Sequence, residues 1–146
     1  MKKIIYQVYI ITLITTCSVY ANTEDSKMTI HSNGQVIVIE EPSFEPHSIG
    51  SFSIRLYKPS NPKFPYDNFI TGVISDRDGS IVEVQVKDLD KDKNNEIIVI
   101  TETAGSGSYF SAYAFNVKNK TIKPYLTINE ANSKKQAIQK LVKNNY

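Results

Sequence analysis

Short stretches of alternating apolar and polar residues dominate the chain beyond its first 27 positions. Residues 81–86, Ile-Val-Glu-Val-Gln-Val, show the pattern most clearly, because the polar Glu83 and Gln85 share one face. A period of two is typical of a β-strand with one face in the core and one in water. Alternation also predicts strands at residues 51–57 and 109–117, and turn signals that flank short apolar segments predict strands at residues 28–31, 35–39, 69–74 and 121–126.

Residues 96–101, Glu-Ile-Ile-Val-Ile-Thr, differ from the other strands because apolar β-branched side chains occupy both faces. Such a segment is typical of the middle of a sheet that is covered on both sides. We therefore expect residues 96–101 to form the central strand of the core.

Turn signals separate the predicted strands. Asn33-Gly34 favours the positive φ angles of a tight hairpin and joins the first two strands. Asp76-Arg77-Asp78-Gly79 predicts a second hairpin, between residues 69–74 and 81–86. Long connections on both sides of the third strand are marked by prolines, namely Pro42, Pro46, Pro59, Pro62 and Pro65. The pattern does not predict the structure of residues 42–68.

The C-terminal residues change to a helical period. Thr127 and Glu130 have the spacing of a capping box, and an apolar stripe follows, formed by Ala137, Ile138, Leu141 and Val142. Lys140 and Lys143 suit the negative end of a helix. The pattern thus predicts a mainly β domain with one short C-terminal helix that covers the core.

The N-terminus has the three parts of a cleavable secretory signal peptide. Lys2 and Lys3 precede an apolar run over residues 4–19, and Val19-Tyr20-Ala21 supplies small residues before Asn22. A transmembrane anchor is the competing interpretation, but the run is shorter than the ~20 apolar residues that a span needs. Lipidation at Cys17 is disfavoured, since the bulky Thr16 precedes it. We expect cleavage between Ala21 and Asn22, a signal peptide at residues 1–21 and one exported domain at residues 22–146.

Charge and cysteine content narrow the function of that domain. Of the 17 Lys and Arg residues, Lys2 and Lys3 leave with the signal, so the remaining 15 balance the 15 acidic residues. There is no electrostatic basis for binding nucleic acid or an anionic membrane. The only cysteine, Cys17, is also lost, which excludes disulfides, thiolate metal sites and cysteine nucleophiles.

An acidic segment, residues 88–96, spaces its carboxylates as a calcium loop does. Asp88, Asp90, Asp92 and Glu96 could converge on one hard cation, as in the shorter calcium loops of propeller repeats. An EF-hand is excluded, because Lys93 and Val99 stand where that loop needs glycine and glutamate. A solvated turn, with Asp side chains bonded to backbone amides, explains the segment more simply, so no metal or cofactor is predicted. The alternative function is a calcium-stabilised exported binding or adhesion module.

A glycine-rich segment, residues 103–110, is the candidate functional loop. Gly105 and Gly107 permit unusual backbone conformations and leave Ser106 and Ser108 unshielded, while Tyr109 offers a flat amphipathic surface. A phosphate site would need a lysine and a following helix, and a nucleophile elbow would need G-x-S-x-G. A hydrolase using His31 or His47 and a hairpin without a role are the remaining alternatives.

The region from residue 84 to residue 115 resembles the periplasmic inhibitors of I-type (invertebrate) lysozyme, which carry an S-G-x-Y loop. The resemblance lies in Asp88-Leu89-Asp90, the acidic turn, Glu96-Ile97-Ile98-Val99 and the loop Ser106-Gly107-Ser108-Tyr109. It implies an antiparallel β-sandwich-like domain in the periplasm, a homodimer, and no enzymatic activity. It further implies that Ser106 and Tyr109 contact the active-site cleft of I-type lysozyme, with Gly107 shaping the loop and Ser108 at a variable position.

Overall fold

The computed structural model describes residues 27–32 and 34–144, so the predicted signal peptide at residues 1–21 lies outside the described residues. The strands form two antiparallel four-stranded sheets, in the orders β1-β2-β3-β4 and β5-β6-β7-β8. The elements are β1 (Lys27–Ser32), β2 (Gln35–Glu40), β3 (Ile49–Tyr57), β4 (Phe69–Asp78), β5 (Ser80–Lys87), β6 (Glu96–Glu102), β7 (Phe110–Lys118), β8 (Thr121–Ala131) and α1 (Lys134–Lys143). The mainly β fold class with one C-terminal helix is confirmed.

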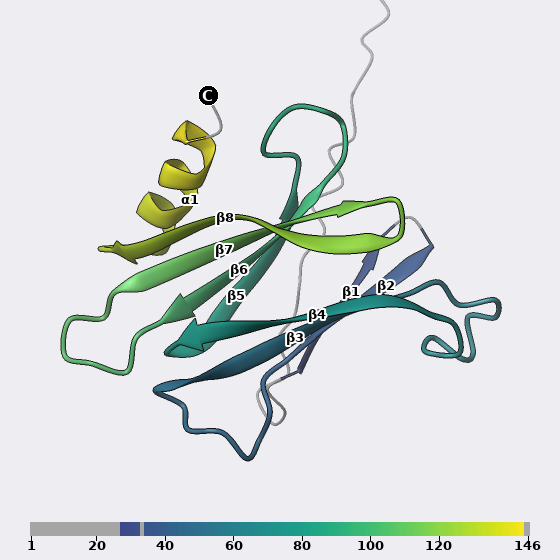
Figure 1. Ribbon diagram of the computed structural model, residues 1–146, viewed down its shortest axis with the longest axis horizontal. Coiled ribbons are helices and arrows are strands. Elements are labelled where there is room, and N and C mark those ends of the chain that lie inside the picture. The colour runs from purple at the N-terminus through teal and green to yellow at the C-terminus, as the bar shows by residue number, and fades with distance from the viewer. Residues whose placement is uncertain (1–26, 33, 145–146) are drawn as a thin grey trace, which may run out of the picture.

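The main core lies between the two sheets, which face one another in Figure 1. Phe52 of β3 contacts Tyr113 and Phe115 of β7 edge to face, with ring centroids 5.6 and 5.8 Å apart. Offset and edge-on aromatic pairs of this kind add stability beyond the area that they bury. The inward side chains of both sheets therefore form the sandwich that the resemblance implies.

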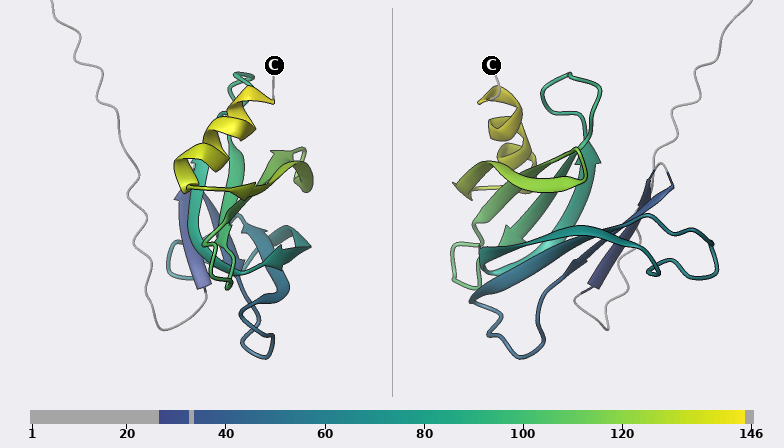
Figure 2. Two further views of the ribbon diagram at one scale, coloured as in Figure 1. Left: turned by 90° about the vertical axis from the view of Figure 1, so that its left-hand side faces the viewer. Right: turned by 45° about the vertical axis from the view of Figure 1, so that its right-hand side comes forward.

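Strand β6 is buried on both faces, as its sequence predicts. Ile97 and Val99 belong to the core between the sheets, whereas Ile98 and Ile100 belong to a second cluster beneath the helix. Figure 2 shows α1 against the sheet that contains β6. The loops at the two ends of β6 are therefore attached to a strand that is packed on both faces.

The helix itself is confirmed, but its predicted start is wrong. Thr127 and Glu130 lie within β8, and the N-cap is Ser133, whose side chain accepts a hydrogen bond from the Gln136 backbone N–H. The Gln136 side chain in turn accepts from the Asn132 backbone N–H at 2.7 Å. The apolar stripe is placed as predicted, with Ala137 and Leu141 fully buried.

The first predicted hairpin is confirmed and the second is wrong. β1 pairs with β2, with Ser32 opposite Gln35. Residues 76–78, in contrast, belong to β4, and the chain crosses from one sheet to the other at Gly79 rather than folding back. Gly79 has φ +80°, and a Cβ there would overlap the Glu102 carbonyl, so this crossing requires glycine.

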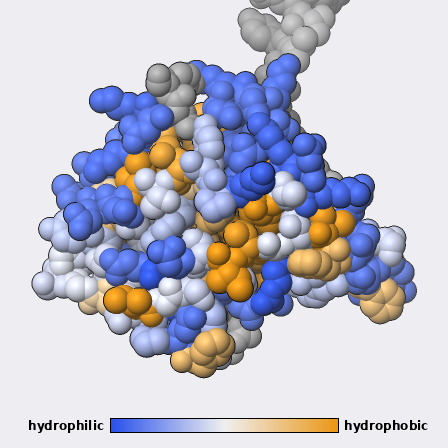
Figure 3. Space-filling view, in the orientation of Figure 1, coloured by the Kyte–Doolittle hydropathy of each residue, from blue (hydrophilic) through white to orange (hydrophobic). Residues whose placement is uncertain are grey.

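The face of the molecule that Figure 3 shows is mostly hydrophilic, with apolar residues gathered near its centre and smaller apolar areas elsewhere. The largest exposed ones lie on the β1–β4 sheet and its loops, and include Phe44, Ile49, Phe64, Phe69 and Ile74. Within residues 27–32 and 34–144, the one helix is too short to span a membrane.

Candidate functional site

The loop between β6 and β7, residues 103–109, carries the candidate residues and projects from one end of the β5–β8 sheet (Figure 1). Ser106, Gly107, Ser108 and Tyr109 are all exposed. The Tyr109 side chain is the only large one among them, and Tyr109 is 45% exposed. The structure thus places all four predicted site residues together in water.

Thr103 closes the neck of the β6–β7 loop with two hydrogen bonds. Its backbone N–H donates to the Tyr109 carbonyl at 2.9 Å, and its Oγ1 accepts from the Tyr109 backbone N–H at 3.1 Å. Residues 103 and 109 are thereby fixed to one another where β6 and β7 separate. Sequence reasoning missed this role, although a threonine just before a glycine-rich segment is a suitable partner for backbone amides.

A turn inside the loop shapes its tip. The Ser108 backbone N–H donates to the Gly105 carbonyl at 3.3 Å, and Ser108 has φ +44°. Neither Gly105 nor Gly107 has a positive φ, so the expectation that the glycines supply unusual backbone conformations is wrong. The left-handed residue is Ser108 itself.

Gly107 is needed for a different reason, which is the close approach of the Tyr109 ring. A Cβ on Gly107 would overlap the ring, whereas Gly105 has no atom near enough to meet an added Cβ. The ring therefore lies over the backbone of residue 107. This contact limits the orientations that Tyr109 can adopt.

Arg77 supports the base of the loop, a role that the sequence did not reveal. Its side chain is 1% exposed and lies 3.6 Å from a carboxylate oxygen of Glu41. Its guanidinium donates to four backbone carbonyls, those of Pro46, His47, Ser51 and Gly79. Since Gly79 packs on Glu102, Arg77 fixes the segment against which the β6–β7 loop starts.

The chemistry of the loop is that of neutral hydroxyl groups and one aromatic ring. Residues 103–109 contain no charged side chain, and the hydroxyls of Ser106, Ser108 and Tyr109 can each donate and accept a hydrogen bond. The histidines of the hydrolase alternative lie elsewhere: His31 is on β1 in the other sheet, and His47 is in the loop before β3. The arrangement is suited to binding polar groups rather than to transferring protons.

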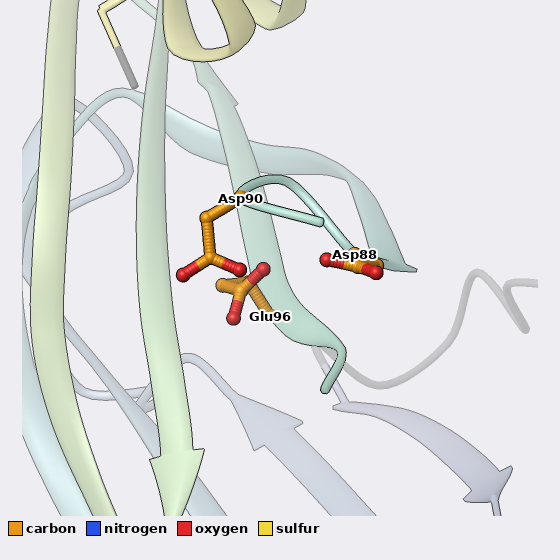
Figure 4. A group of neighbouring side chains, drawn as sticks. All are labelled: Asp88, Asp90 and Glu96. Carbon is orange, nitrogen blue, oxygen red and sulfur yellow. The ribbon is translucent and has the colours of Figure 1, made fainter. Parts of the chain in front are cut away.

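A second group of candidate residues lies in the loop between β5 and β6. Carboxylate oxygens of Asp88, Asp90 and Glu96 lie within 4.8 Å of one another, and Figure 4 shows the Asp90 and Glu96 side chains side by side. Burial raises the pKa of Glu96, and the nearby Asp90 carboxylate adds to this rise.

Asp92, the fourth acidic residue, is engaged outside this group. It forms an ion pair with Lys118 and accepts a hydrogen bond from the Asn94 backbone N–H at 2.8 Å. These two bonds hold the pKa of Asp92 well below its usual value. The structure therefore brings together three of the four carboxylates that the sequence suggested.

Comparisons with known proteins bear on the family and the fold of the chain. The family model described as periplasmic lysozyme inhibitor of I-type lysozyme matches residues 23–145. The crystal structure of the PliI inhibitor from Aeromonas hydrophila is similar, with a TM-score of 0.72 and 40% identity, covering 79% of this chain and 98% of that chain. The structure of A. hydrophila PliI in complex with Meretrix lusoria lysozyme has a TM-score of 0.68 and 44% identity, covering 74% and 87%. No curated protein matches the chain significantly.

Proposed function

This chain belongs to the family of periplasmic inhibitors of I-type lysozyme, and from that premise we propose that its β6–β7 loop enters the active-site cleft of the enzyme. The observation that carries the proposal is the exposed, neutral loop closed by Thr103 and tipped by Ser106 and Tyr109. The family sets the partner, I-type lysozyme, and the compartment, the periplasm.

The chemistry of a lysozyme cleft suits the residues that the loop presents. Lysozymes cleave glycosidic bonds with carboxyl groups that flank the cleft. The Ser106 hydroxyl donates a hydrogen bond to such a carboxylate, and hydrogen bonds to ionised acceptors are stronger than neutral ones. The Tyr109 ring occupies a sugar subsite by stacking, with its hydroxyl directed to polar groups.

The closed neck reduces the conformational entropy that the β6–β7 loop loses on binding. Association loses affinity whenever a flexible loop must be ordered at the interface. Thr103 holds both ends of the loop, and the packing of the Tyr109 ring on Gly107 restricts the ring before the enzyme is met. A pre-ordered loop therefore retains more of its contact energy as affinity.

Inhibition of this kind needs no catalytic group, and we propose that the chain is not an enzyme. It blocks the cleft by occupying it. Purified protein incubated with bacterial cell wall alone is expected to release no soluble fragments, and steady release above a buffer control contradicts this.

The proposal is tested with residues 22–146 in a cell-wall clearing assay against I-type, C-type and G-type lysozymes. We expect stoichiometric inhibition of the I-type enzyme and much weaker effects on the other two. An I-type enzyme that remains fully active in the presence of excess protein contradicts the assigned activity.

A variant pair tests the loop itself. Ser106→Ala combined with Tyr109→Ala is expected to weaken inhibition at least ~30-fold, the effect of losing about 2 kcal/mol at an interface hot spot. The melting temperature should hardly change, because both residues are exposed. Tyr66→Ala is the matched control, since Tyr66 is also 45% exposed but lies in the loop between β3 and β4. If the double variant inhibits as well as the control, the loop is not the inhibitory site.

Two sequence expectations accompany the proposal. The family match starts at residue 23, which supports cleavage of the signal peptide before Asn22. N-terminal sequencing of the protein purified from the periplasm tests this cleavage site.

The homodimer stays a prediction, for which light scattering on the purified protein is the direct measurement.

A further inference from the structure

The carboxylates of Asp88, Asp90 and Glu96, here called the acidic cluster, converge at the point where the chain enters β6 (Figure 4). Three like charges whose oxygens lie within 4.8 Å repel one another strongly unless a positive charge lies between them. The position of the acidic cluster therefore needs an explanation beyond a solvated turn.

One oxygen of each carboxylate accepts a hydrogen bond from a backbone N–H of the loop. Glu96 Oε2 accepts from the Leu89 N–H at 2.8 Å, and Asp88 Oδ2 accepts from the Lys93 N–H at 3.0 Å. Asp90 Oδ1 accepts from the Asp92 N–H at 3.1 Å. These bonds fix the side chains and, among residues 27–32 and 34–144, leave one oxygen of each without a backbone donor.

The oxygens that remain include two that are buried without a partner. Glu96 is 0% exposed, and its Oε1 has no hydrogen bond within the described part of the chain. Asp88 Oδ1 is likewise buried and unpartnered there. A buried carboxylate oxygen without a donor costs several kcal/mol, so native proteins pair such groups or bind a cation with them.

The two buried oxygens accept no hydrogen bond from any side chain within the described residues. Lys118, the lysine on β7, donates to Asp92, which is not a member of the acidic cluster. A cation from solution that binds to Glu96 Oε1 and Asp88 Oδ1 satisfies both oxygens at once.

We propose that the acidic cluster is a calcium-binding site. Oxygen ligands select hard cations, and oxygens bound at 2.3–2.6 Å to one Ca²⁺ can be up to about 5 Å apart. Mg²⁺ demands near-ideal octahedral geometry and gives up its water ligands reluctantly, so a site built from several protein carboxylates favours Ca²⁺. Calcium takes six to eight oxygens, so water completes the coordination.

The site acts on stability rather than on inhibition. It lies where β6 begins, whereas the β6–β7 loop leaves the other end of the same strand (Figure 1). A bound ion ties Asp88 and Asp90 of the β5–β6 loop to Glu96 of the central strand. We therefore expect calcium to raise the melting temperature and to leave the inhibition constant unchanged, so this inference and the proposed function fail independently.

The experiment compares the melting temperature of residues 22–146 in about 5 mM CaCl₂, in about 5 mM MgCl₂ and in the presence of a chelator. The salt concentration of about 5 mM exceeds the millimolar dissociation constants of weak calcium sites. Calcium is expected to raise the melting temperature by at least about 5 °C, and magnesium by much less. Titration calorimetry with CaCl₂ should show one site per chain.

Charge-neutral variants assign the effect to the acidic cluster. Glu96→Gln keeps an oxygen that accepts from the Leu89 N–H but loses the charge, so it should fold and lose the calcium response. Asp90→Asn tests the same point at a less buried position and should lower the calcium affinity at least ~10-fold. Asp76→Asn, an exposed position on β4, is the control that keeps the full response.

Three results would overturn the inference. One is a wild-type protein without calorimetric binding and without a calcium-dependent shift, in which case Glu96 is compensated by a proton. Another is an equal shift with magnesium, which removes the basis for selecting calcium. The third is a full calcium response in both Glu96→Gln and Asp90→Asn, which places the ion elsewhere.

Discussion

Replacing Thr103 by valine removes one of the two hydrogen bonds at the neck of the β6–β7 loop while keeping the size of the side chain. The lost bond is the 3.1 Å contact from the Tyr109 N–H to Thr103 Oγ1, and the 2.9 Å backbone bond in the opposite direction remains. Because the Tyr109 N–H can then bond to water, the cost is the net value of one hydrogen bond, about 0.5–1.5 kcal/mol.

The loss of this free energy lowers the population of the closed conformation of the loop. An inhibitor whose binding-competent conformation is less populated loses affinity by the same factor. We therefore expect Thr103→Val to weaken inhibition of I-type lysozyme by up to about 13-fold, the limit that about 1.5 kcal/mol sets on the change in the closed population. No residue that touches the enzyme in the proposed complex is changed.

The assay measures the inhibition constant and the melting temperature of Thr103→Val and Thr103→Ser side by side. Serine keeps the hydroxyl oxygen and loses only a methyl group, so it should inhibit nearly as well as the wild type. Equal inhibition constants for the two variants would refute the reasoning, because the hydrogen bond then contributes nothing to loop order. A loss much greater than about 13-fold would also refute it, since one hydrogen bond cannot supply that much.

Three further predictions concern the scaffold. Arg77→Met should lower the free energy of unfolding in urea by about 3–5 kcal/mol, because it removes a buried ion pair with Glu41 and the hydrogen bonds to four backbone carbonyls. Arg55→Met, at an exposed ion pair with Glu40, should cost less than about 1 kcal/mol, and similar losses in the two variants would contradict the role of Arg77. Ser133→Ala should cost about 1 kcal/mol in the same assay by removing the N-cap of α1, and an unchanged stability would show that the cap is dispensable. Hydrogen bonds from the Ser51 N–H and hydroxyl lower the pKa of Glu45, so the stability that Glu45 adds is complete above its ordinary pKa of 4.5 and is lost as the pH falls through the lower folded-state value. The stability difference between wild type and Glu45→Gln should therefore shrink below about pH 4.5, and a difference that grows there would reverse the sign.

The strands were predictable where side-chain burial follows the period of the backbone. β6 is apolar on both faces and is buried on both, and β3 follows its alternating pattern. The stripe of α1 was equally readable, since Ala137 and Leu141 pack under the helix. In these segments the local pattern and the tertiary contacts agree. β7 was predicted to alternate but is buried on both faces over residues 111–115.

The sequence misled where turn-forming residues serve another purpose. Residues 76–79 have the composition of a hairpin turn. The buried Arg77 side chain, however, donates hydrogen bonds to backbone carbonyls that are distant in sequence, such as that of Pro46. No local pattern reveals such long-range partners. The capping box failed because Ser133 and Gln136 offer the same spacing a few residues after Thr127 and Glu130.

The candidate loop could be identified from its composition, but its hydrogen bonds and backbone conformation could not. Glycine spacing and Tyr109 identified residues 106–109, whereas the neck at Thr103 and the left-handed Ser108 emerged only from the structure. The acidic segment shows the same division. Its residues were evident, but the burial of Glu96, on which the proposed calcium site rests, emerged only from the structure.

Competition for the lysozyme cleft tests the central claim most directly. Titration calorimetry measures the affinity of residues 22–146 for an I-type lysozyme with and without a saturating, slowly cleaved cell-wall oligosaccharide. If the β6–β7 loop occupies the cleft, the apparent association constant must fall in proportion to the fraction of enzyme whose cleft is free of sugar. An affinity that is unchanged by the oligosaccharide would show that enzyme, sugar and inhibitor bind together, and would contradict the claim.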